Sequence, residues 1–552
     1  MRGMEREGGL RRGVRLSAAM ATMYGLAVLA VLGASPAPAQ TATPSSGRAP
    51  TEGSVSSPSR PATEGASKIV EPVENDAPLV LAARKNDAAS LRALLDAKAD
   101  VNQHTADGTT ALHWAVYHDD VDLVDRLIAA GANVKATNDY GATPMSEAAV
   151  VGNVKVLRKL LAAGADAEST NSDGQTALMI IARTSNVEAA KLLLSKRAQV
   201  NAREQWRGQT PLMWATAEGQ PAMTKLLIEH GAEVDAHSNV NQWERQVTSE
   251  PRMQARPSGG FTPLLYAARK GCTECARILL KAGADKNLTD PDGVSPLLLA
   301  TLNFNFDIAA LLIERGANVN KWDMWGRSAL YAAVDMNTLP TGGRADRPSL
   351  DRTTSLQLIE LLLKAGANPN LQLKLFPPYR SLRDDRGADT LLSVGTTPLV
   401  RAAKAGDVAA MKLLIAHGAN VDLPTANGIT PMMAASGVGS SAIDTRGRYK
   451  TEPQAIEAVQ VLVAAGANVN ARDRNGQSSL HGAATLGWND LVKTLVASKV
   501  DLMAKDAQGR TAADVAKGVS GVSGRAGSQP HPETEALLRQ LMAGASPPVA
   551  GR

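Results

Sequence analysis

Apolar residues recur along most of this chain as two short stretches of helical spacing, each followed by turn residues. The segment Asp292–Met324, DGVSPLLLATLNFNFDIAALLIERGANVNKWDM, shows the pattern clearly. Its first stretch opens with Ser295 and Pro296, residue types that are favoured at the N-cap and the first turn of a helix. Leu297 and Leu298 then begin an apolar face. The pattern predicts a short helix that starts directly after a turn.

A second helix is predicted a few residues later. The stretch FDIAALLIERG places Ile308, Leu311 and Leu312 at helical spacing. Gly316 follows where the end of a helix favours a left-handed backbone. The residues ANVNKWDMWG then run as an extended finger into the next turn. The predicted unit is therefore helix, turn, helix and finger.

The same unit returns about every 33 residues. Gly108, Gly141 and Gly174 occupy its opening turn at intervals of 33, and the phrases DGTTALHWA, RGQTPLMWA, GGFTPLLYA and WGRSALYAA echo one another. Such a period indicates a stack of supersecondary units, each burying its apolar face against its neighbours. A stack accounts for a chain of 552 residues that is 44% hydrophobic but only 3% aromatic, since thin layers of Ala, Leu and Val suffice for its core.

The phrase, the period, the turn glycine and the recurring LL..GA.VN together resemble the ankyrin repeat family, whose signature includes T-P-L-H-x-A at this period. The resemblance covers residues 76–542. It implies an all-α solenoid of about twelve helix-turn-helix units with β-hairpin or finger loops, curved and elongated. Residues 543–552 are expected to form a disordered tail.

Three positions depart from the pattern at the end of the second helix. Lys98, Arg197 and Lys499 stand where the other units have glycine. If the backbone keeps a positive φ there, each residue costs about 1 kcal/mol. We therefore expect the lowest local stability in the first, fourth and eleventh units.

Four insertions, each 15 to 19 residues beyond the regular spacing, fall between the fifth and tenth units. Residues 237–259 and 371–394 lengthen fingers, whereas residues 336–354 and 438–453 lengthen the turn between paired helices. Insertions in repeat proteins map to loops, often on the binding face. This placement predicts a binding site between the fifth and ninth units.

The N-terminal segment has the layout of a secretory signal peptide. Arginines precede the apolar run Leu16–Ala34, and the small residues Ala37–Ala39 come directly before Gln40. We predict a signal at residues 1–39, cleaved near Ala39–Gln40, and export to the periplasm or beyond. A retained membrane anchor is the alternative. Residues 40–75, rich in Ser, Thr and Pro, are expected to be a disordered tether.

Charge argues against a nucleic-acid partner. The formal net charge of +5 falls to +2 once the five Arg and two Glu of residues 1–39 are removed. The remaining chain has no run or stripe of Lys and Arg of the kind that nucleic-acid binding normally needs.

The pair Cys272 and Cys275, in CTEC, begins the second helix of the sixth unit. A thiol at a helix N-terminus has a lowered pKa, and Cys-x-x-Cys can support dithiol chemistry. An exported protein can also hold the pair as a structural or regulatory disulfide. Cys275 falls where the family places a buried aliphatic residue, which favours inert thiols.

Other candidate chemistry is sparse. His113 and His481 occupy the histidine of the family phrase, which the resemblance assigns to bonding loop backbone, and the remaining histidines lack metal-ligand spacing. There is no G-x-S-x-G, phosphate loop or H-E-x-x-H. We expect no enzyme activity, no metal and no cofactor.

Large side chains gather instead where family members bind partners, at finger tips and on the facing side of the first helix. The first-helix ends also carry Tyr117, His118, Arg183 and Lys404. Trp, Tyr and Arg dominate binding hot spots. The predicted partner-binding residues are Tyr140, Trp206, Arg207, Trp243, Phe261, Arg269, Lys270, Trp322, Trp325, Arg327, Phe376, Tyr379 and Arg380.

These patterns predict a monomeric, non-catalytic protein-binding scaffold that acts outside the cytoplasm and has no membrane contact once the signal is cleaved. Two alternatives stay open. One is a thiol-redox protein that uses Cys272 and Cys275. The other is a docking or protective subunit of an exported oxidoreductase.

Overall fold

The computed structural model describes residues 77–246, 253–338, 351–375, 394–439, 450–518 and 529–544, and within 242–258 only the course of two strands. The chain divides into two units, Met1–Glu71 and Pro72–Arg552. The described residues belong to the second. The predicted signal peptide and tether lie outside them, as do residues 545–552 of the predicted tail and large parts of three of the four insertions. Residues 543 and 544, also predicted to belong to the disordered tail, are helical, so that boundary is wrong.

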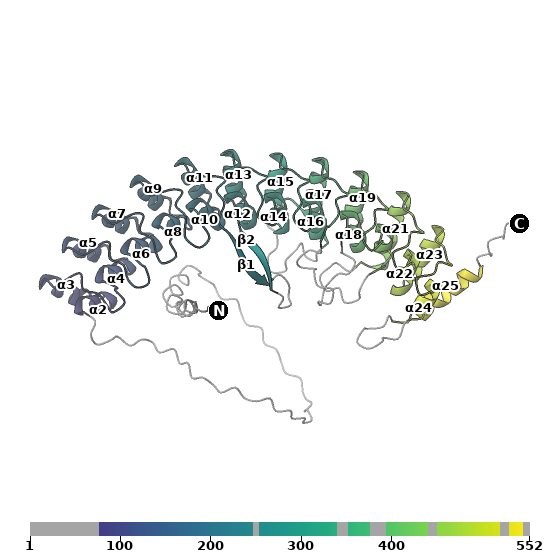
Figure 1. Ribbon diagram of the computed structural model, residues 1–552, viewed down its shortest axis with the longest axis horizontal. Helices are drawn as coiled ribbons and strands as arrows, with labels where there is room; N and C mark the ends of the chain where they lie inside the picture. Colours follow the sequence, from purple (N-terminus) through teal and green to yellow (C-terminus); the bar gives the residue numbers. More distant parts are fainter. Residues whose placement is uncertain are drawn as a thin grey trace, which may run out of the picture. The chain divides into compact units, whose positions relative to one another are not determined.

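The helices come in pairs that follow the repeat of the sequence (Figure 1). The first helices of the pairs are α2 (Pro78–Arg84), α4 (Ala111–Tyr117), α6 (Pro144–Val151), α8 (Ala177–Ala182), α10 (Pro211–Glu218), α12 (Pro263–Lys270), α14 (Pro296–Leu302), α16 (Ala329–Asn337), α18 (Pro398–Ala405), α20 (Pro431–Ala435), α22 (Ser479–Leu486) and α24 (Ala512–Ala516). The second helices are α3 (Ala88–Asp96), α5 (Val121–Ala129), α7 (Val154–Ala162), α9 (Val187–Ser195), α11 (Pro221–Glu229), α13 (Thr273–Lys281), α15 (Phe306–Glu314), α17 (Ser355–Lys364), α19 (Val408–Ala416), α21 (Glu452–Ala464), α23 (Asn489–Ala497) and α25 (Pro532–Gly544).

Two layers of helices result from this pairing. Each first helix packs against the first helix of the next pair, and the second helices pack in the same order from α5 to α25. The core between the layers is built from Leu, Val and Ala, and alanines such as Ala115, Ala148 and Ala267 are fully buried. Their small side chains allow neighbouring helices to approach closely. No helix of the described residues is both long enough and apolar enough to cross a membrane.

Helix boundaries follow the predicted signals. The hydroxyl of Ser295 accepts the backbone N–H of Leu298, and Pro296 is the first residue of α14. Gly316 has a φ of 71°, as its place after the second helix requires. Lys98, Arg197 and Lys499 also keep positive φ angles, 57°, 70° and 65°, so the predicted strain is present.

Near the ends of the second helices, a row of asparagine amides joins five of these helix ends to the preceding finger. Asn102 shows the geometry: its Nδ2 donates to the carbonyl of Gly131, and its Oδ1 accepts the N–H of Asn133. The same two bonds are made by Asn201, Asn320, Asn370 and Asn470 to the next repeat. We call this row the asparagine ladder.

The finger insertion at residues 237–259 forms the two-stranded sheet of the described residues. Strands β1 (Val240–Gln246) and β2 (Met253–Gly259) pair antiparallel, from Val240 opposite Gly259 to Gln246 opposite Met253. Two bonds between Ser238 and Phe261 close its base. The hairpin projects away from the layer of second helices (Figure 1). The hairpin extends the finger between α11 and α12.

A buried ion pair links the eighth and ninth repeats, between which two of the insertions lie. The Nε atom of Arg401 in α18 lies 2.5 Å from Oδ1 of Asp335 in α16, and both side chains are almost fully buried. Close by, Asn337 donates to Asp407. Breaking a buried pair leaves an uncompensated charge, which typically costs several kcal/mol. These contacts hold α16 and α18 in register.

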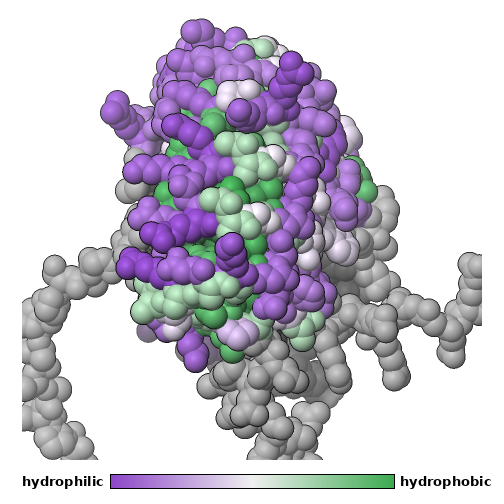
Figure 2. Space-filling model, turned by 90° about the vertical axis from the view of Figure 1, so that its left-hand side faces the viewer, coloured by the Kyte–Doolittle hydropathy of each residue, from purple (hydrophilic) through white to green (hydrophobic). Residues whose placement is uncertain are grey.

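One end of the array is partly apolar. Leu81, Leu94 and Leu95 of α2 and α3 are only partly buried. Figure 2 looks onto this end and shows hydrophobic residues between two hydrophilic borders. Within the described residues, the first repeat therefore lacks the polar outer face that closes many repeat arrays.

Changing Arg197 to glycine should stabilise the fourth repeat. Glycine removes the steric cost of a φ of 70° but adds freedom to the unfolded chain. We expect a net gain of about 0.5–1 kcal/mol in the free energy of local opening of α9, measured by native-state hydrogen exchange. Lys196→Gly is the matched control, because Lys196 has a φ of −95°. Equal gains in both variants would contradict the strain at Arg197.

Candidate functional site

Two tryptophans stand out on the fingers. The side chain of Trp206 is 64% exposed and that of Trp322 is 44% exposed, although both are large and apolar. Arg207 is exposed beside Trp206, and Tyr140 is half-buried on an earlier finger. The Nζ of Lys374 lies 3.4 Å from the centre of the Trp322 ring, which is a cation–π contact. The structure thus leaves these predicted residues accessible.

Trp325 and Arg327, also predicted to bind a partner, are buried, so that prediction is wrong for both. They are 4% and 5% exposed. The carboxylate of Asp323 accepts the backbone N–H groups of both residues and pairs with the Arg327 guanidinium at 2.7 Å. The backbone N–H of Lys374 also donates to the carbonyl of Trp325. The finger therefore folds back on itself and is covered by its neighbour.

Phe261, Arg269 and Lys270 form a neighbouring group on the sixth repeat. The ring of Phe261 meets that of Tyr266 edge to face at 5.4 Å, and the Arg269 guanidinium lies over both rings. Arg269 and Lys270 are exposed. Lys270 also pairs with Glu218 at 3.7 Å. The side chains of Trp243, Phe376, Tyr379 and Arg380 lie outside the described residues.

A second aromatic group lies on the second repeat. Trp114 contacts Tyr117 and His118, with ring centres 5.7 and 6.2 Å away, and Arg84 of the preceding repeat lies over the Trp114 ring. Sequence reasoning noted Tyr117 and His118 but missed Trp114 and Arg84. The signal was present, because Trp114 and Trp214 occupy the variable position of the phrase, and Arg183 lies over Trp214 in the same way.

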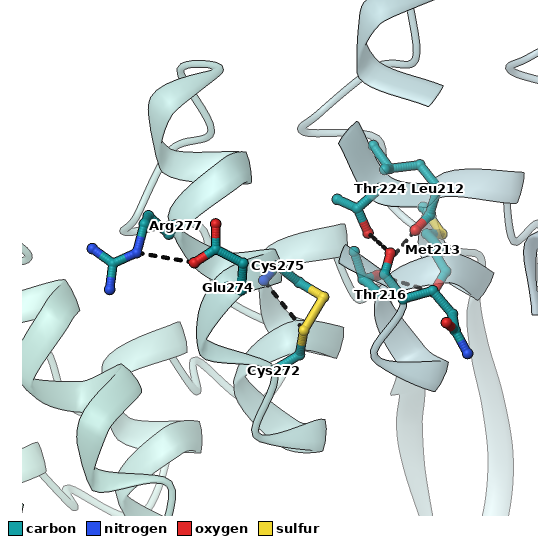
Figure 3. Close-up of a disulfide and its surroundings, with 9 residues drawn as sticks. Leu212, Met213, Thr216, Thr224, Cys272, Glu274, Cys275 and Arg277 are labelled. Atoms are coloured by element: carbon teal, nitrogen blue, oxygen red, sulfur yellow. Dashed lines mark hydrogen bonds and ion pairs between the residues drawn. A yellow bond between two sulfur atoms is a disulfide. The ribbon is translucent and has the colours of Figure 1, made fainter. Parts of the chain in front are cut away.

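Cys272 and Cys275 are joined by a disulfide, so the expectation of inert thiols is wrong. Cys272 is the N-cap of α13 and accepts the backbone N–H of Cys275, a task that Asp120, Asn153 and Asn186 perform on other second helices. Cys275 is fully buried, whereas Cys272 is half-buried. The bridge faces α10 and α11, and the ion pair of Glu274 with Arg277 lies on the opposite side of the helix (Figure 3).

Comparison with known families matches the model described as ankyrin repeats (3 copies) to residues 79–171, 148–238, 264–373 and 349–443. These matches span more than half of the chain. The chain belongs to the ankyrin repeat family.

Among solved structures, the chain is similar to the crystal structure of the human ASB11 ankyrin repeat domain. The identity is 25%, the match covers 44% of this chain and 99% of that chain, and the TM-score is 0.36. No curated protein gives a significant match to this chain.

The histidines of the ankyrin phrase are structural, as predicted. Nε2 of His113 donates to the carbonyl of Ala142 on the next finger, and Nε2 of His481 donates to that of Arg510. Burial lowers the pKa of both imidazoles, so neither gains a charge easily. Within the described residues, no cluster of His, Cys, Asp and Glu could hold a metal ion.

One carboxylate of the ankyrin fingers has an unusual environment. Burial raises the pKa of Asp290 to about 6, and the nearby carboxylates of Asp292 and Asp323 add to the rise. The backbone N–H of Val294 donates to the Asp290 carboxylate, and this hydrogen bond opposes the rise in its pKa. A carboxyl group whose pKa rises on folding binds its proton more tightly in the folded chain. The ionised form therefore costs stability above pH 6, and this cost disappears as the pH falls towards 4.

Asp290→Asn should therefore stabilise the protein at pH 7.5, because asparagine still accepts the N–H of Val294 but carries no charge. We expect a gain of about 1 kcal/mol after allowing for solvent screening, which shrinks towards zero near pH 4. Urea unfolding at the two pH values measures it. Asp139→Asn, on an exposed finger position, is the control. An equal pH-dependent gain in the control would contradict the role of burial at Asp290.

Proposed function

We propose that this protein is a non-catalytic scaffold that binds one or more protein partners through its fingers and the face of its first helices. Ankyrin repeats typically mediate protein–protein interaction. The observation that carries the proposal for this chain is the exposure of Trp206 and Trp322. An exposed tryptophan loses contact with water when a partner covers it, which makes it a frequent binding anchor.

The two tryptophans flank one stretch of the array. They lie on the fingers before α10 and α16, which are three repeats apart. At the usual 8–10 Å between packed helices, about 25–30 Å separates them. That distance suits an ordinary protein interface. The hairpin β1–β2 and the Phe261–Arg269 group lie between them in the chain.

Trp206→Ala together with Trp322→Ala should weaken partner binding by at least about 2 kcal/mol, because both rings are exposed anchors. The partner is first captured from an extracytoplasmic fraction with the mature chain, and affinity is then measured by surface plasmon resonance. Trp325 is left unchanged, because its burial would confound binding with stability.

The matched control is Met503→Ala, since Met503 is 57% exposed on a finger far from both tryptophans. Circular dichroism should show the same helical signal in all variants. Unchanged affinity in the double variant would place the binding site elsewhere on the array.

We also infer that the array holds twelve repeats and is a curved, elongated monomer. The paired helices from α2 and α3 to α24 and α25 support this count. Small-angle scattering of the mature chain should report an elongated particle, and a compact radius of gyration would oppose the inference.

Export remains a proposal that rests on residues 1–39 of the sequence. The disulfide of Cys272 with Cys275 supports it, because such bridges persist mainly in oxidising compartments. Expression in a bacterial host and N-terminal sequencing of the periplasmic protein should show a chain that begins at Gln40. An intact Met1 in the cytoplasmic fraction would oppose export.

The disulfide also keeps thiol-redox chemistry as a second candidate. A half-buried Cys272 at a helix N-terminus, joined to a buried Cys275, is an arrangement that can exchange with an external dithiol. Replacing both cysteines with alanine separates the two candidates. A scaffold keeps its partner, whereas a redox protein loses its ability to oxidise a reduced model substrate.

A further inference from the structure

Three exposed arginines lie over aromatic rings on the first-helix layer. The guanidinium carbon of Arg84 is 5.7 Å from the centre of the Trp114 ring, and that of Arg183 is 4.9 Å from the centre of the Trp214 ring. Arg269 lies 5.1 Å from the centre of the Tyr266 ring. Each arginine is at or next to the C-terminal end of a first helix, α2, α8 or α12. We call this set the stacked arginines.

The three rings occupy one position of the repeat. They are the variable residue in TALHWA, TPLMWA and TPLLYA, which begin α4, α10 and α12. Equivalent positions of equivalent helices face the same way in a stack of repeats. The rings, and the arginines that lie over them, therefore belong to one face of the array.

Stacking orients each guanidinium without using its hydrogen-bonding capacity. A ring contacts the flat face of the group, whereas its N–H donors point outward in the plane. Among the residues that the structure describes, no carboxylate or carbonyl accepts a hydrogen bond from any of the stacked arginines, and all three are exposed. The donors are therefore held in place, and no acceptor from the described residues bonds to them.

Among the described residues, no carboxylate of this face forms an ion pair with a stacked arginine. Glu147 takes the ring position in the third repeat and is half-buried. Glu218 pairs with Lys270, and Asp119 accepts from the side chain of Asn153. Within the described part of the chain, the three stacked guanidinium groups between α2 and α12 therefore have no ion-pair partner.

We propose that this face binds an extended acidic segment of a partner protein, whose carboxylates pair with Arg84, Arg183 and Arg269. The inference rests on the proposed protein-binding function and adds the chemistry of the partner. Arg84 and Arg183 are three repeats apart, and Arg183 and Arg269 are two. At 8–10 Å for each repeat the set spans about 40–50 Å, which an extended chain covers in about 12–15 residues.

The spacing favours a protein segment over a nucleic acid. Nucleic acids carry a phosphate at every nucleotide, and their binding sites usually contain a dense row of basic residues. Here the stacked arginines are separated by about 16–30 Å. Such sparse cations match carboxylates placed several residues apart, and each planar guanidinium suits the two oxygens of a carboxylate.

The probe is a fluorescein-labelled peptide of sixteen residues with alternating Glu and Ser, and its control is the same peptide with Gln in place of Glu. Fluorescence anisotropy at low salt measures binding to the mature chain. Arg84→Gln, Arg183→Gln and Arg269→Gln are combined in one variant. We expect wild type to bind the Glu peptide and not the Gln peptide, and the variant to bind at least tenfold more weakly.

The matched control combines Arg92→Gln, Arg126→Gln and Arg158→Gln. These arginines are exposed on the second helices α3, α5 and α7, and their loss changes the net charge by the same amount. Binding should fall less than twofold. A third variant with lysine at the three stacked positions keeps the charge but loses the planar fork, so its affinity should lie between those of wild type and the glutamine variant.

Three results would overturn the inference: no binding of the Glu peptide by wild type, equal losses in the two glutamine variants, or tighter binding of a sixteen-residue oligothymidylate than of the Glu peptide. The captured partner provides a separate check. A partner that binds the stacked-arginine variant with unchanged affinity defeats this inference but leaves the scaffold function standing. A wild-type chain that captures no partner defeats the scaffold function itself.

Discussion

The array depends on how each repeat packs on the one before it, and at five of these contacts the asparagine ladder supplies a directional part. Apolar packing between Ala and Leu layers is strong but tolerates sliding, because it has no preferred register. The amide of Asn102, in contrast, both donates to the carbonyl of Gly131 and accepts from the N–H of Asn133. Two bonds from one planar group fix the position and the orientation of the next helix end. They also satisfy a backbone carbonyl and a backbone N–H of the loop that follows the helix.

The ladder explains why the sequence predicts this fold so well. The asparagine of the recurring VN bonds to the glycine that ends the second helix of the next repeat, so two residues that recur in the sequence report a contact between repeats. Lys499 shows the strength of this arrangement: it holds a positive φ of 65° while its carbonyl accepts from Asn470. The roles of Ser295, Gly316 and the histidines of the ankyrin phrase could also be predicted from the sequence. Their partners lie within one repeat or in the next finger.

The candidate site was less predictable, because it depends on contacts that no period reveals. Trp325 looks like an exposed finger tip in the sequence, yet its exposure is decided by Asp323 and by Lys374 from an inserted segment. The stacking of Arg183 on Trp214 joins residues of two different repeats whose side chains vary from unit to unit. The disulfide, too, replaces a common Asp or Asn cap by a bond that the spacing alone left undecided.

The ladder also separates the spacing of the repeats from the variation of their loops. Asn320 and Asn370 reach partners 48 and 50 residues away across insertions, with the same bonds that Asn102 makes across 31 residues. The inserted residues therefore leave the spacing between repeats unchanged, because the chain returns to the array before the next ladder bond is made. The side of the array that carries the ladder sets the spacing between repeats. The inserted segments differ in length and in sequence without changing that spacing. New recognition loops can arise in such a protein without any change to the frame that carries them.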